Sequence, residues 1–320
     1  MVVVTGATGL LGGHILSKLL SEGVETVALY RGDHQLPEGV IKKQADVLDQ
    51  VSLREAFEGA DTVIHSAAYV SFNPRRERKV FDTNVQGTRN AIDACLQLGI
   101  KNFIQISSVA ALGRSTREPI TEDSKWNNIL STDYAESKYR AELEVYRGAE
   151  EGLTISMVNP SVILAADQIS RSSATLFDYV WNEKSFYTNG SLNYVDARDV
   201  AEAVFQLYKK PQHLEKFILS AGSIPFKDFF TEVAKRFGKK PPSIEVSAGL
   251  THWAGLAEEI RAFMLNKEPV VTRQSALMAV QSFQYKNQKS VDLLGIRYKS
   301  LEQTLAWCCE AYLRNVKPKK

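Results

Sequence analysis

The sequence opens with a short apolar run that leads through closely spaced glycines into an amphipathic segment. Residues 2–4 are all valine, which is typical of a strand buried on both faces of a parallel sheet. The glycines follow at intervals of three residues, at Gly6, Gly9 and Gly12. Apolar side chains then recur at helical spacing between Leu11 and Leu20. The pattern predicts a strand, a sharp turn and a helix, which is the usual start of an open α/β sheet.

A turn of this kind brings bare backbone next to the first N–H groups of a helix. Those groups and the positive end of the helix dipole favour a phosphate, and side chains at the glycine positions would block its approach. The spacing is G-x-x-G-x-x-G, whereas the usual dinucleotide fingerprint is G-x-G-x-x-G. Glycines also occur in loops that only turn the chain. The strand before this loop and the helix after it favour a site for a dinucleotide pyrophosphate.

The end of the second predicted strand, residues 26–29, bears on the choice of dinucleotide. In this architecture a carboxylate there binds the free ribose 2′-hydroxyl of NAD, and an arginine accommodates the 2′-phosphate of NADP. Arg31 is the first charged residue past the strand, which favours NADP as the cofactor. A solvated loop arginine is the alternative interpretation. Asp33 follows two residues later and would favour NAD if it turned inward.

Strand-like and helical patterns alternate along the chain. The clearest strands are residues 2–4, 26–29, 62–65, 103–107 and 154–158, and the clearest helices are residues 10–22, 84–98 and 134–151. This alternation predicts an α/β fold with a doubly wound parallel sheet of the Rossmann type. We assign residues 1–164 and 196–224 to the dinucleotide-binding Rossmann domain. Residues 165–195 and 225–320 are expected to form a smaller, mostly helical substrate-binding lobe over the active-site cleft.

The bulk composition argues against several classes of protein. The chain has 320 residues and a formal net charge of +2, with no basic stretch interleaved with aromatics, so nucleic acid is not an expected partner. Its three cysteines and five histidines lack the spacing of a disulfide framework or a metal site. No apolar stretch reaches the roughly 18 residues of a membrane span, and the early glycine loop leaves no room for a signal peptide. We expect a cytoplasmic protein that has no membrane partner.

Tyr134 and Lys138 lie four residues apart on a predicted helix, so their side chains share one face. A tyrosine hydroxyl has a pKa of about 10. A nearby ammonium should lower that pKa, which would make the pair a general acid or base at neutral pH. Tyr285 and Lys289 repeat the spacing, but only the first pair follows a buried strand that ends in Ser107-Ser108 at the ligand-binding edge of the sheet. We interpret the second pair as surface or packing residues.

In their order along the chain, these motifs resemble the extended short-chain dehydrogenase/reductase superfamily, in its NAD-dependent epimerase/dehydratase group. The resemblance covers nearly the whole length and extends to a further pattern at residues 194–201. It implies that the glycine loop holds the dinucleotide, that an Asp-Val pair holds the adenine, and that a Pro-Ser pair lies by the nicotinamide. The implied cofactor-binding residues are Gly6, Thr8, Gly9, Leu10, Leu11, Gly12, Arg31, Asp46, Val47, Ser66, Ala67, Ala68, Tyr134, Lys138, Pro160 and Ser161.

The resemblance also implies a catalytic set of Ser108, Tyr134 and Lys138, with Ser108 matching the family's serine better than Ser107. The stretch at residues 157–164 lacks the R-Y-F-N-type pattern of sugar-nucleotide epimerases, and Leu112 stands where many epimerases carry a tyrosine before the glycine. The chain is more similar to the dihydroflavonol reductase-like branch, whose members reduce ketones or aldehydes with NADPH. We therefore expect an NADP-dependent carbonyl reductase or alcohol dehydrogenase.

Two other functions remain open from the sequence. One is a nucleotide-sugar epimerase or dehydratase that retains NAD, and the other is a non-catalytic NADP-sensing protein, a class that commonly lacks the Tyr–Lys pair. By analogy with the family, we expect a homodimer formed through the helices at residues 84–98 and 134–151. The partner at the active site would be a small-molecule carbonyl substrate.

For several other residues the sequence allows a structural role as well as a functional one. His65 is interpreted as a core or loop histidine, Asp199 as a helix cap, and Asn84 either as a residue that orders the site through hydrogen bonds or as packing. A group of aromatics in the predicted lobe would line a substrate pocket or form a core. These aromatics are Phe177, Tyr179, Trp181, Phe186 and Tyr187.

Overall fold

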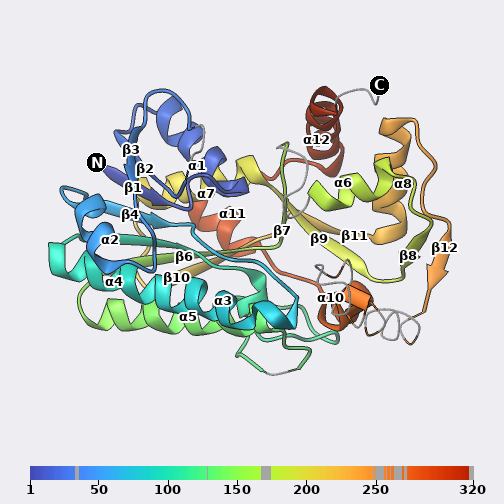
Figure 1. Cartoon of the computed structure of the whole chain (residues 1–320), viewed down its shortest axis with the longest axis horizontal. Coiled ribbons are helices and arrows are strands. Elements are labelled where there is room, and N and C mark those ends of the chain that lie inside the picture. The colour runs from blue at the N-terminus through green and yellow to red at the C-terminus, as the bar shows by residue number, and fades with distance from the viewer. Residues whose placement is uncertain are drawn as a thin grey trace.

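The computed structural model describes residues 1–32, 36–127, 129–166, 174–247, 249, 256, 258–259, 261–262, 269 and 272–316. Its larger part is built on a parallel sheet, and a smaller lobe stands at one end of that sheet (Figure 1). The sheet consists of β1 (Val2–Thr5), β2 (Thr26–Tyr30), β3 (Ile41–Gln44), β4 (Thr62–His65), β5 (Asn102–Ile106), β6 (Thr154–Pro160) and β10 (Glu215–Leu219). The strand order β10-β6-β5-β4-β1-β2-β3 confirms the predicted Rossmann fold.

Helices cover both faces of this sheet, as Figure 1 shows. One face carries α1 (Leu10–Ser21), α7 (Ala197–Lys209) and α11 (Gln288–Leu294), and the other carries α2 (Gln50–Phe57), α4 (Gly87–Leu98) and α5 (Asp133–Glu150). In β1, Val2 and Val4 pack with α1 and α7, whereas Val3 packs with α2 and α4. Burial on both sides explains why the strand is a continuous apolar run rather than an alternating one.

The predicted strands correspond to β1, β2, β4, β5 and β6, and the short predicted strand at residues 217–219 is part of β10. The edge strand β3 was not predicted. Its residues are mostly exposed and include two lysines, so it lacks the apolar run of a buried strand. The helix predicted at residues 84–98 begins earlier, with α3 (Glu77–Phe81) and one turn of π-helix at Asp82–Gln86 before α4. Two short 3₁₀ turns, Pro74–Arg76 and Val109–Ala111, complete this half of the molecule.

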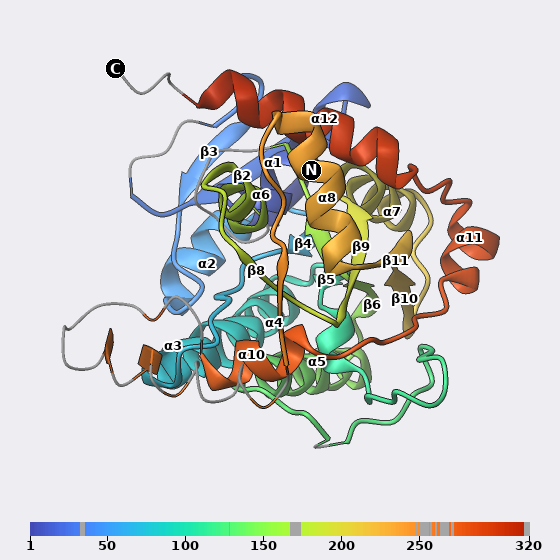
Figure 2. The same cartoon turned by 90° about the vertical axis from the view of Figure 1, so that its right-hand side faces the viewer.

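The smaller lobe combines helices with two short sheets. Its helices are α6 (Ala174–Trp181), α8 (Phe226–Phe237), α10 (Arg273–Ala279) and α12 (Leu301–Asn315). One sheet has the order β11 (Gly222–Pro225), β9 (Ser191–Asp196), β7 (Val162–Leu164), and the other pairs β12 (Ile244–Val246) with β8 (Phe186–Thr188). In Figure 2, α12 crosses one side of this lobe and α10 lies on the opposite side. The predicted division gave α11 to this lobe, but α11 packs on the large sheet, where its Leu294 joins the core.

The lobe has an aromatic core of its own. Phe177 and Tyr187 are buried there among residues of α8 and α12, with Tyr179 and Trp181 packed against them. Phe186 is exposed. None of these five aromatics is among the described residues that line the main cavity. The core interpretation is correct for four of them, and neither interpretation holds for Phe186.

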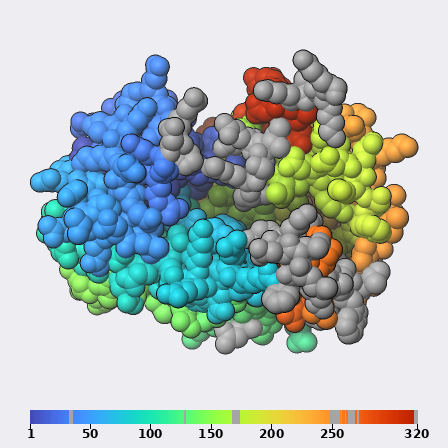
Figure 3. All heavy atoms as spheres, viewed as in Figure 1, coloured from blue at the N-terminus to red at the C-terminus, as the bar shows by residue number. Residues whose placement is uncertain are grey.

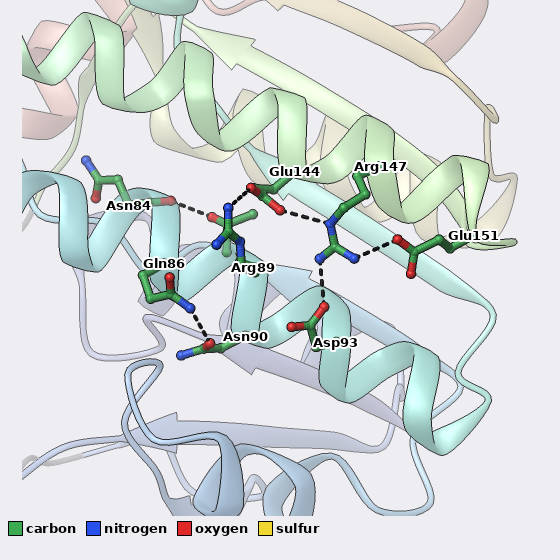
Figure 4. Close-up of polar contacts among 9 residues, drawn as sticks. Asn84, Gln86, Arg89, Asn90, Asp93, Glu144, Arg147 and Glu151 are labelled. Carbon is green, nitrogen blue, oxygen red and sulfur yellow. Dashed lines mark hydrogen bonds and ion pairs between the residues drawn. The ribbon is translucent and has the colours of Figure 1, made fainter.

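Charged side chains connect α4 to α5 on the outer face of the large domain (Figure 4). Arg89 of α4 pairs with Glu144 of α5 at 2.6 Å, and Arg147 of α5 pairs with Asp93 of α4 at 2.7 Å. Arg147 also contacts Glu144 at 2.9 Å and Glu151 at 2.8 Å. This network links α5, the helix that carries Tyr134 and Lys138, to α4.

Candidate active site

A cavity of about 940 Å³ opens at the carboxyl edge of the large sheet, with residues of the smaller lobe forming part of its wall. In Figure 3 the N-terminal part of the chain, in blue, and the smaller lobe, in yellow-green and orange, stand on opposite sides of the molecule. The predicted site residues that line the cavity are Gly9, Leu10, Leu11, Gly12, Ser66, Ala68, Ser108, Tyr134, Lys138, Pro160 and Ser161. One cavity therefore brings together loops that follow β1, β4, β5 and β6, as expected for a doubly wound sheet.

The glycines of the first loop have different structural reasons. Gly6 has a φ of 65°, and a Cβ on it would come within 2.6 Å of the Ala67 backbone nitrogen. A Cβ on Gly12 would come within 2.2 Å of the Gly6 carbonyl oxygen. These two glycines let strand, loop and helix pack closely. Gly9 lines the cavity, as Gly12 also does, and a Cβ on Gly9 would meet the Gly6 carbonyl oxygen at 3.1 Å.

The N-terminus of α1 is open to a ligand. Gly9 is the N-cap residue and offers no side-chain cap, and Leu10 and Leu11 of the first turn line the cavity. The first N–H groups of a helix need acceptors, and the positive end of its dipole favours an anion. Ser161 supplies a second open position, since its buried hydroxyl has no hydrogen-bond partner among the described residues and it too lines the cavity. These features fit the pyrophosphate and the nicotinamide end of a dinucleotide.

The predicted catalytic residues converge from two elements. Ser108 ends the segment after β5, where its hydroxyl caps the short 3₁₀ turn by accepting from the Ala110 nitrogen at 3.1 Å. Tyr134 lies in the first turn of α5. The N-cap of that helix is Thr132, whose hydroxyl accepts from the Ala135 nitrogen at 3.1 Å. The Tyr134 hydroxyl is within hydrogen-bonding reach of the Ser108 side chain. The structure thus places the tyrosine that we predicted to be the proton donor beside a second hydroxyl in the cavity.

The electrostatics of this pair differ from the sequence-based expectation. Burial raises the pKa of Tyr134 above its ordinary value, and the hydrogen bond with Ser108 only partly opposes that effect. Lys138 is buried and donates to the Ile106 carbonyl oxygen at 2.7 Å. Burial lowers its pKa to about 8, against the opposing charge of Glu142. The expected lowering of the Tyr134 pKa by Lys138 is therefore not seen, because the ammonium is directed to a carbonyl and desolvation dominates at the phenol.

Asn84 orders the site through hydrogen bonds. Its Oδ1 accepts from the Tyr69 nitrogen at 2.7 Å, and its Nδ2 donates to the Tyr69 carbonyl at 3.1 Å and to Ser137 Oγ at 2.9 Å. Ser137 in turn donates to the Tyr134 carbonyl at 2.8 Å. Asn84 sits in the π-helical turn before α4, a distortion that often marks functional sites. It links the loop after β4 to the helix that carries Tyr134.

A buried carboxylate near the site was missed by the sequence analysis. Glu142 Oε1 accepts from Ser107 Oγ at 2.5 Å and from Asn159 Nδ2 at 2.6 Å. Asn159 also donates to the Ser108 carbonyl at 3.0 Å. Burial raises the pKa of Glu142, while the hydrogen bonds and the charges of Lys216 and Lys138 oppose that rise. The spacing was a usable signal, since Glu142 stands four residues after Lys138 on the same buried face of α5.

Comparison with known proteins agrees with this geometry. The model of the NAD dependent epimerase/dehydratase family matches residues 2–220. The chain belongs to this family. A protein of Synechocystis sp. named as a candidate dihydroflavonol 4-reductase is 27% identical over 315 residues, which cover 95% of this chain and 92% of the relative. Cinnamoyl-CoA reductase 1 of Oryza sativa subsp. japonica is 30% identical over 241 residues, which cover 68% of this chain and 70% of the relative. The predicted resemblance to the family and to its reductase branch is confirmed.

Among solved structures of similar fold, the crystal structure of gox2253 has a TM-score of 0.85 and 28% sequence identity, with 99% of both chains covered. The match extends over the smaller lobe as well as the sheet. Within the described residues, no group of histidine, cysteine and carboxylate side chains is arranged to hold a metal ion. No helix of that described part is long and apolar enough to cross a membrane.

Some residues expected to bind the dinucleotide lie outside the described lining of the cavity, namely Gly6, Thr8, Arg31, Asp46, Val47 and Ala67. Arg31 Nη1 pairs with Asp46 Oδ2 at 3.2 Å, and the Arg31 side chain is 60% exposed. Val47 is buried, and its carbonyl accepts from Asn90 Nδ2 at 2.9 Å. Thus two residues that the family resemblance assigns to the adenosine end, Arg31 and Asp46, are neighbours at the surface. Asp33 lies outside the described residues.

The structure also shows the roles of His65 and Asp199. His65 is fully buried, its Nδ1 pairs with Thr5 Oγ1 at 2.9 Å, and burial lowers its pKa to about 3, so it is a core residue. Asp199 does not cap α7, because the cap is Asp196 and Asp199 accepts from the Lys299 backbone nitrogen at 2.8 Å.

The second tyrosine–lysine pair is split in the structure. Lys289 lies in α11, pairs with Glu215 of β10 and is a packing residue as predicted. Tyr285 precedes α11 and lines the cavity, so its reading as a surface or packing residue is incomplete. Burial raises its pKa to about 12. The pair does not share a helix face, which confirms that the spacing alone was a weak signal.

Proposed function

We propose that this protein is an NADP-dependent oxidoreductase that transfers a hydride between the nicotinamide and a small carbonyl or alcohol substrate. The observation that carries the proposal is the convergence of Ser108, Tyr134 and Lys138 in a cavity that begins at the glycine loop. When bound, the dinucleotide supplies or accepts the hydride. The reductase names of the relatives support the reductive direction of this chemistry.

The residues of the chain act on the substrate oxygen. Ser108 holds the carbonyl oxygen by a hydrogen bond, and the Tyr134 hydroxyl donates its proton to that oxygen as negative charge develops there. A phenol with a raised pKa stays protonated at neutral pH, which suits a donor in the reductive direction. Lys138 uses one of its three N–H donors on the Ile106 carbonyl and keeps the others for ribose hydroxyls and for the phenolate left after proton transfer.

The preference for NADP rests on Arg31. It follows β2, where the adenosine ribose lies in this fold, and its exposed side chain can turn from Asp46 to a 2′-phosphate. A guanidinium can bind phosphate oxygens in a bidentate way. The competing arrangement leaves Arg31 on Asp46 and binds NAD, which is the arrangement that an epimerase or dehydratase with retained cofactor would use.

One experiment separates the candidate functions. The purified protein is assayed for NADPH oxidation across a panel of aldehydes and ketones, and its denatured extract is analysed for co-purified dinucleotide. A reductase consumes NADPH with at least one carbonyl compound and carries little bound NAD. Stoichiometric NAD in the extract, without NADPH consumption, would overturn the proposal in favour of an epimerase or dehydratase. Tight NADPH binding without turnover on any panel member, together with a Tyr134→Phe variant of unchanged properties, would favour a sensor.

A further inference from the structure

The cavity wall away from the glycine loop is built around one buried arginine. Arg114 follows β5 by way of Ser108 and lines the cavity with only 8% of its surface exposed. Its Nη1 contacts Met278 of α10, and Figures 1 and 2 both place α10 on the opposite side of the molecule from α1. The guanidinium therefore lies on the side of the cavity away from the glycine loop, where a substrate would extend.

The immediate surroundings of this guanidinium are neutral. Nη1 donates to the Leu130 carbonyl and lies 2.8 Å from Met278 Sδ. The guanidinium carbon is 6.0 Å from the centre of the Phe283 ring. Leu130, Met278 and Phe283 belong to one apolar cluster that also includes Tyr285. Among the described residues that line the cavity there is no aspartate or glutamate, so the wall offers this charge no carboxylate.

Three buried carboxylates in this chain each have a cationic partner, whereas buried Lys138 donates to the Ile106 carbonyl and buried Glu122 accepts from the Ile218 nitrogen. Asp196 has the Arg198 guanidinium at 2.7 Å, Asp199 has the Lys299 ammonium at 2.7 Å, and Glu142 has the Lys216 ammonium at 3.8 Å. An arginine keeps its charge inside a protein, and a buried charge without a counter-charge is costly. Burial accordingly lowers the pKa of Arg114, with only the Tyr285 phenol acting in the other direction. A site that maintains such a charge next to a catalytic cavity is suited to an anion from outside the chain.

The backbone around Arg114 is held firmly in place. Asn127 brackets it with two hydrogen bonds, from the Arg114 nitrogen to Oδ1 at 3.4 Å and from Nδ2 to the Arg114 carbonyl at 3.1 Å. The neighbouring segment packs so closely that a Cβ on Gly113 would fall 1.8 Å from the Lys125 carbonyl oxygen. Leu130, whose carbonyl accepts from Nη1, has a φ of 56°, a strained conformation for a leucine. The backbone of Arg114 and the Leu130 contact thus hold the guanidinium in one position.

We propose that Arg114 is the specificity residue of this site and binds a carboxylate or phosphate group on the substrate, so that the substrate is an acidic carbonyl compound. The inference rests on the proposed function, because it names the substrate class of the same cavity. Nη1 is occupied by Leu130, and the edge formed by Nε and Nη2 can bind the two oxygens of an acidic group side by side. The carbonyl of such a substrate then lies at Ser108 and Tyr134.

The kinetic test compares paired substrates that differ by one carboxylate group, such as 4-carboxybenzaldehyde with benzaldehyde and 4-oxobutanoate with butanal. In the wild type, kcat/KM with NADPH should be higher for the acidic member of each pair. Arg114→Met should lower kcat/KM for the acidic members by about 10- to 100-fold, the usual effect of losing hydrogen bonds to a charged group, and leave the neutral members within about 2-fold. Arg117→Met, an exposed arginine on the same segment, is the matched control and should leave both unchanged.

A binding test keeps the inference separate from the proposed reaction. Benzoate and benzamide are titrated calorimetrically into the wild type and into Arg114→Met, with Arg114→Lys as a second variant that keeps the charge if the methionine variant does not fold. Benzoate should bind the wild type more tightly than benzamide, and this preference should vanish in Arg114→Met and persist in weakened form in Arg114→Lys. A benzoate preference without carbonyl reduction would overturn the proposed function and leave the anion site standing. Equal losses for acidic and neutral ligands would overturn the anion site and leave Arg114 as a structural residue.

Discussion

Glu142→Gln is the perturbation that most directly tests how the buried network supports the catalytic residues. The substitution keeps the size of the side chain and removes its charge. In the structure the charged carboxylate accepts hydrogen bonds from the Ser107 hydroxyl and from the Asn159 amide. The same amide also donates to the Ser108 carbonyl. The same charge acts on Lys138, four residues earlier on α5. The substitution should therefore change both the stability of the fold and the titration of the active site.

The magnitudes follow from these contacts. A hydrogen bond to a charged group contributes about 1.5–3 kcal/mol and a neutral one about 0.5–1.5 kcal/mol. Making two charged bonds neutral should thus cost about 2 kcal/mol of hydrogen-bond free energy. The relief from no longer burying a charge opposes that loss, so the net change in the free energy of unfolding should be smaller. The charge of Glu142 raises the pKa of Lys138, which burial holds at about 8. An opposite charge close by favours the charged form of a group, so the removal of the Glu142 charge should lower the pKa of Lys138 further.

The assay is kcat/KM against pH, which reports groups of the free enzyme. The proposed mechanism requires a protonated Lys138, so it predicts that activity is lost as pH rises through the pKa of Lys138, near pH 8 in the wild type. In Glu142→Gln this alkaline limb should move down by about one pH unit. Glu144→Gln is the matched control, because Glu144 is on the same helix but pairs with Arg89 and Arg147 at the surface. An alkaline limb that stays in place in Glu142→Gln, in a folded protein, would refute the coupling between the two residues.

Three further outcomes are expected. Tyr134→Phe should bind cofactor normally but lose ~10²–10⁴-fold in kcat, which is the contribution of a positioned proton donor. Tyr285→Phe should retain turnover of a neutral aldehyde. Near-normal turnover in Tyr134→Phe would refute the role assigned to Tyr134. Arg31→Ala should weaken the affinity for NADPH roughly 10-fold, at the low end for a charged contact because Arg31 is exposed. The affinity for NADH should not change. Equal weakening of both affinities in a binding titration would contradict the proposed role of Arg31. Sedimentation should show a homodimer formed through α4 and α5, and a monomer at micromolar concentration would contradict that pairing.

The fold was predictable to the extent that burial leaves a pattern in the chain. β1, β4 and β5 are buried on both faces, so each appears as a short apolar run between turn residues. The edge strand β3 has no such pattern, because Ile41 and its lysine neighbours face solvent. The two small sheets of the lobe escaped prediction for a similar reason. Their strands are three to six residues long and interrupt segments whose strongest pattern is helical or aromatic.

The site was predictable in its membership but not in its electrostatics. The motifs placed Ser108, Tyr134 and Lys138 in one cavity, since all three depend on the carboxyl edge of the sheet and on one helix face. The direction of the Tyr134 pKa change was predicted wrongly. The sequence shows that the Lys138 ammonium is near, but not that this ammonium donates to the Ile106 carbonyl. Glu142 escaped notice because a glutamate on a helix is usually solvated, and its burial depends on Asn159 of β6.

The glycine-loop end of the cavity and the end near Arg114 differ in how their residues are brought together. This difference determines how much of each end can be predicted from the sequence. The glycine loop is assembled within one strand–turn–helix unit, so local spacing is enough to identify it. The substrate end depends on a contact between Arg114 and Met278, which are 164 residues apart, and on Phe283 beyond it. No local pattern marks a charge as buried when the residues that bury it are so distant. A family with a shared cofactor loop can therefore change substrates by altering either partner of such a contact, and each change leaves the recognisable motifs intact.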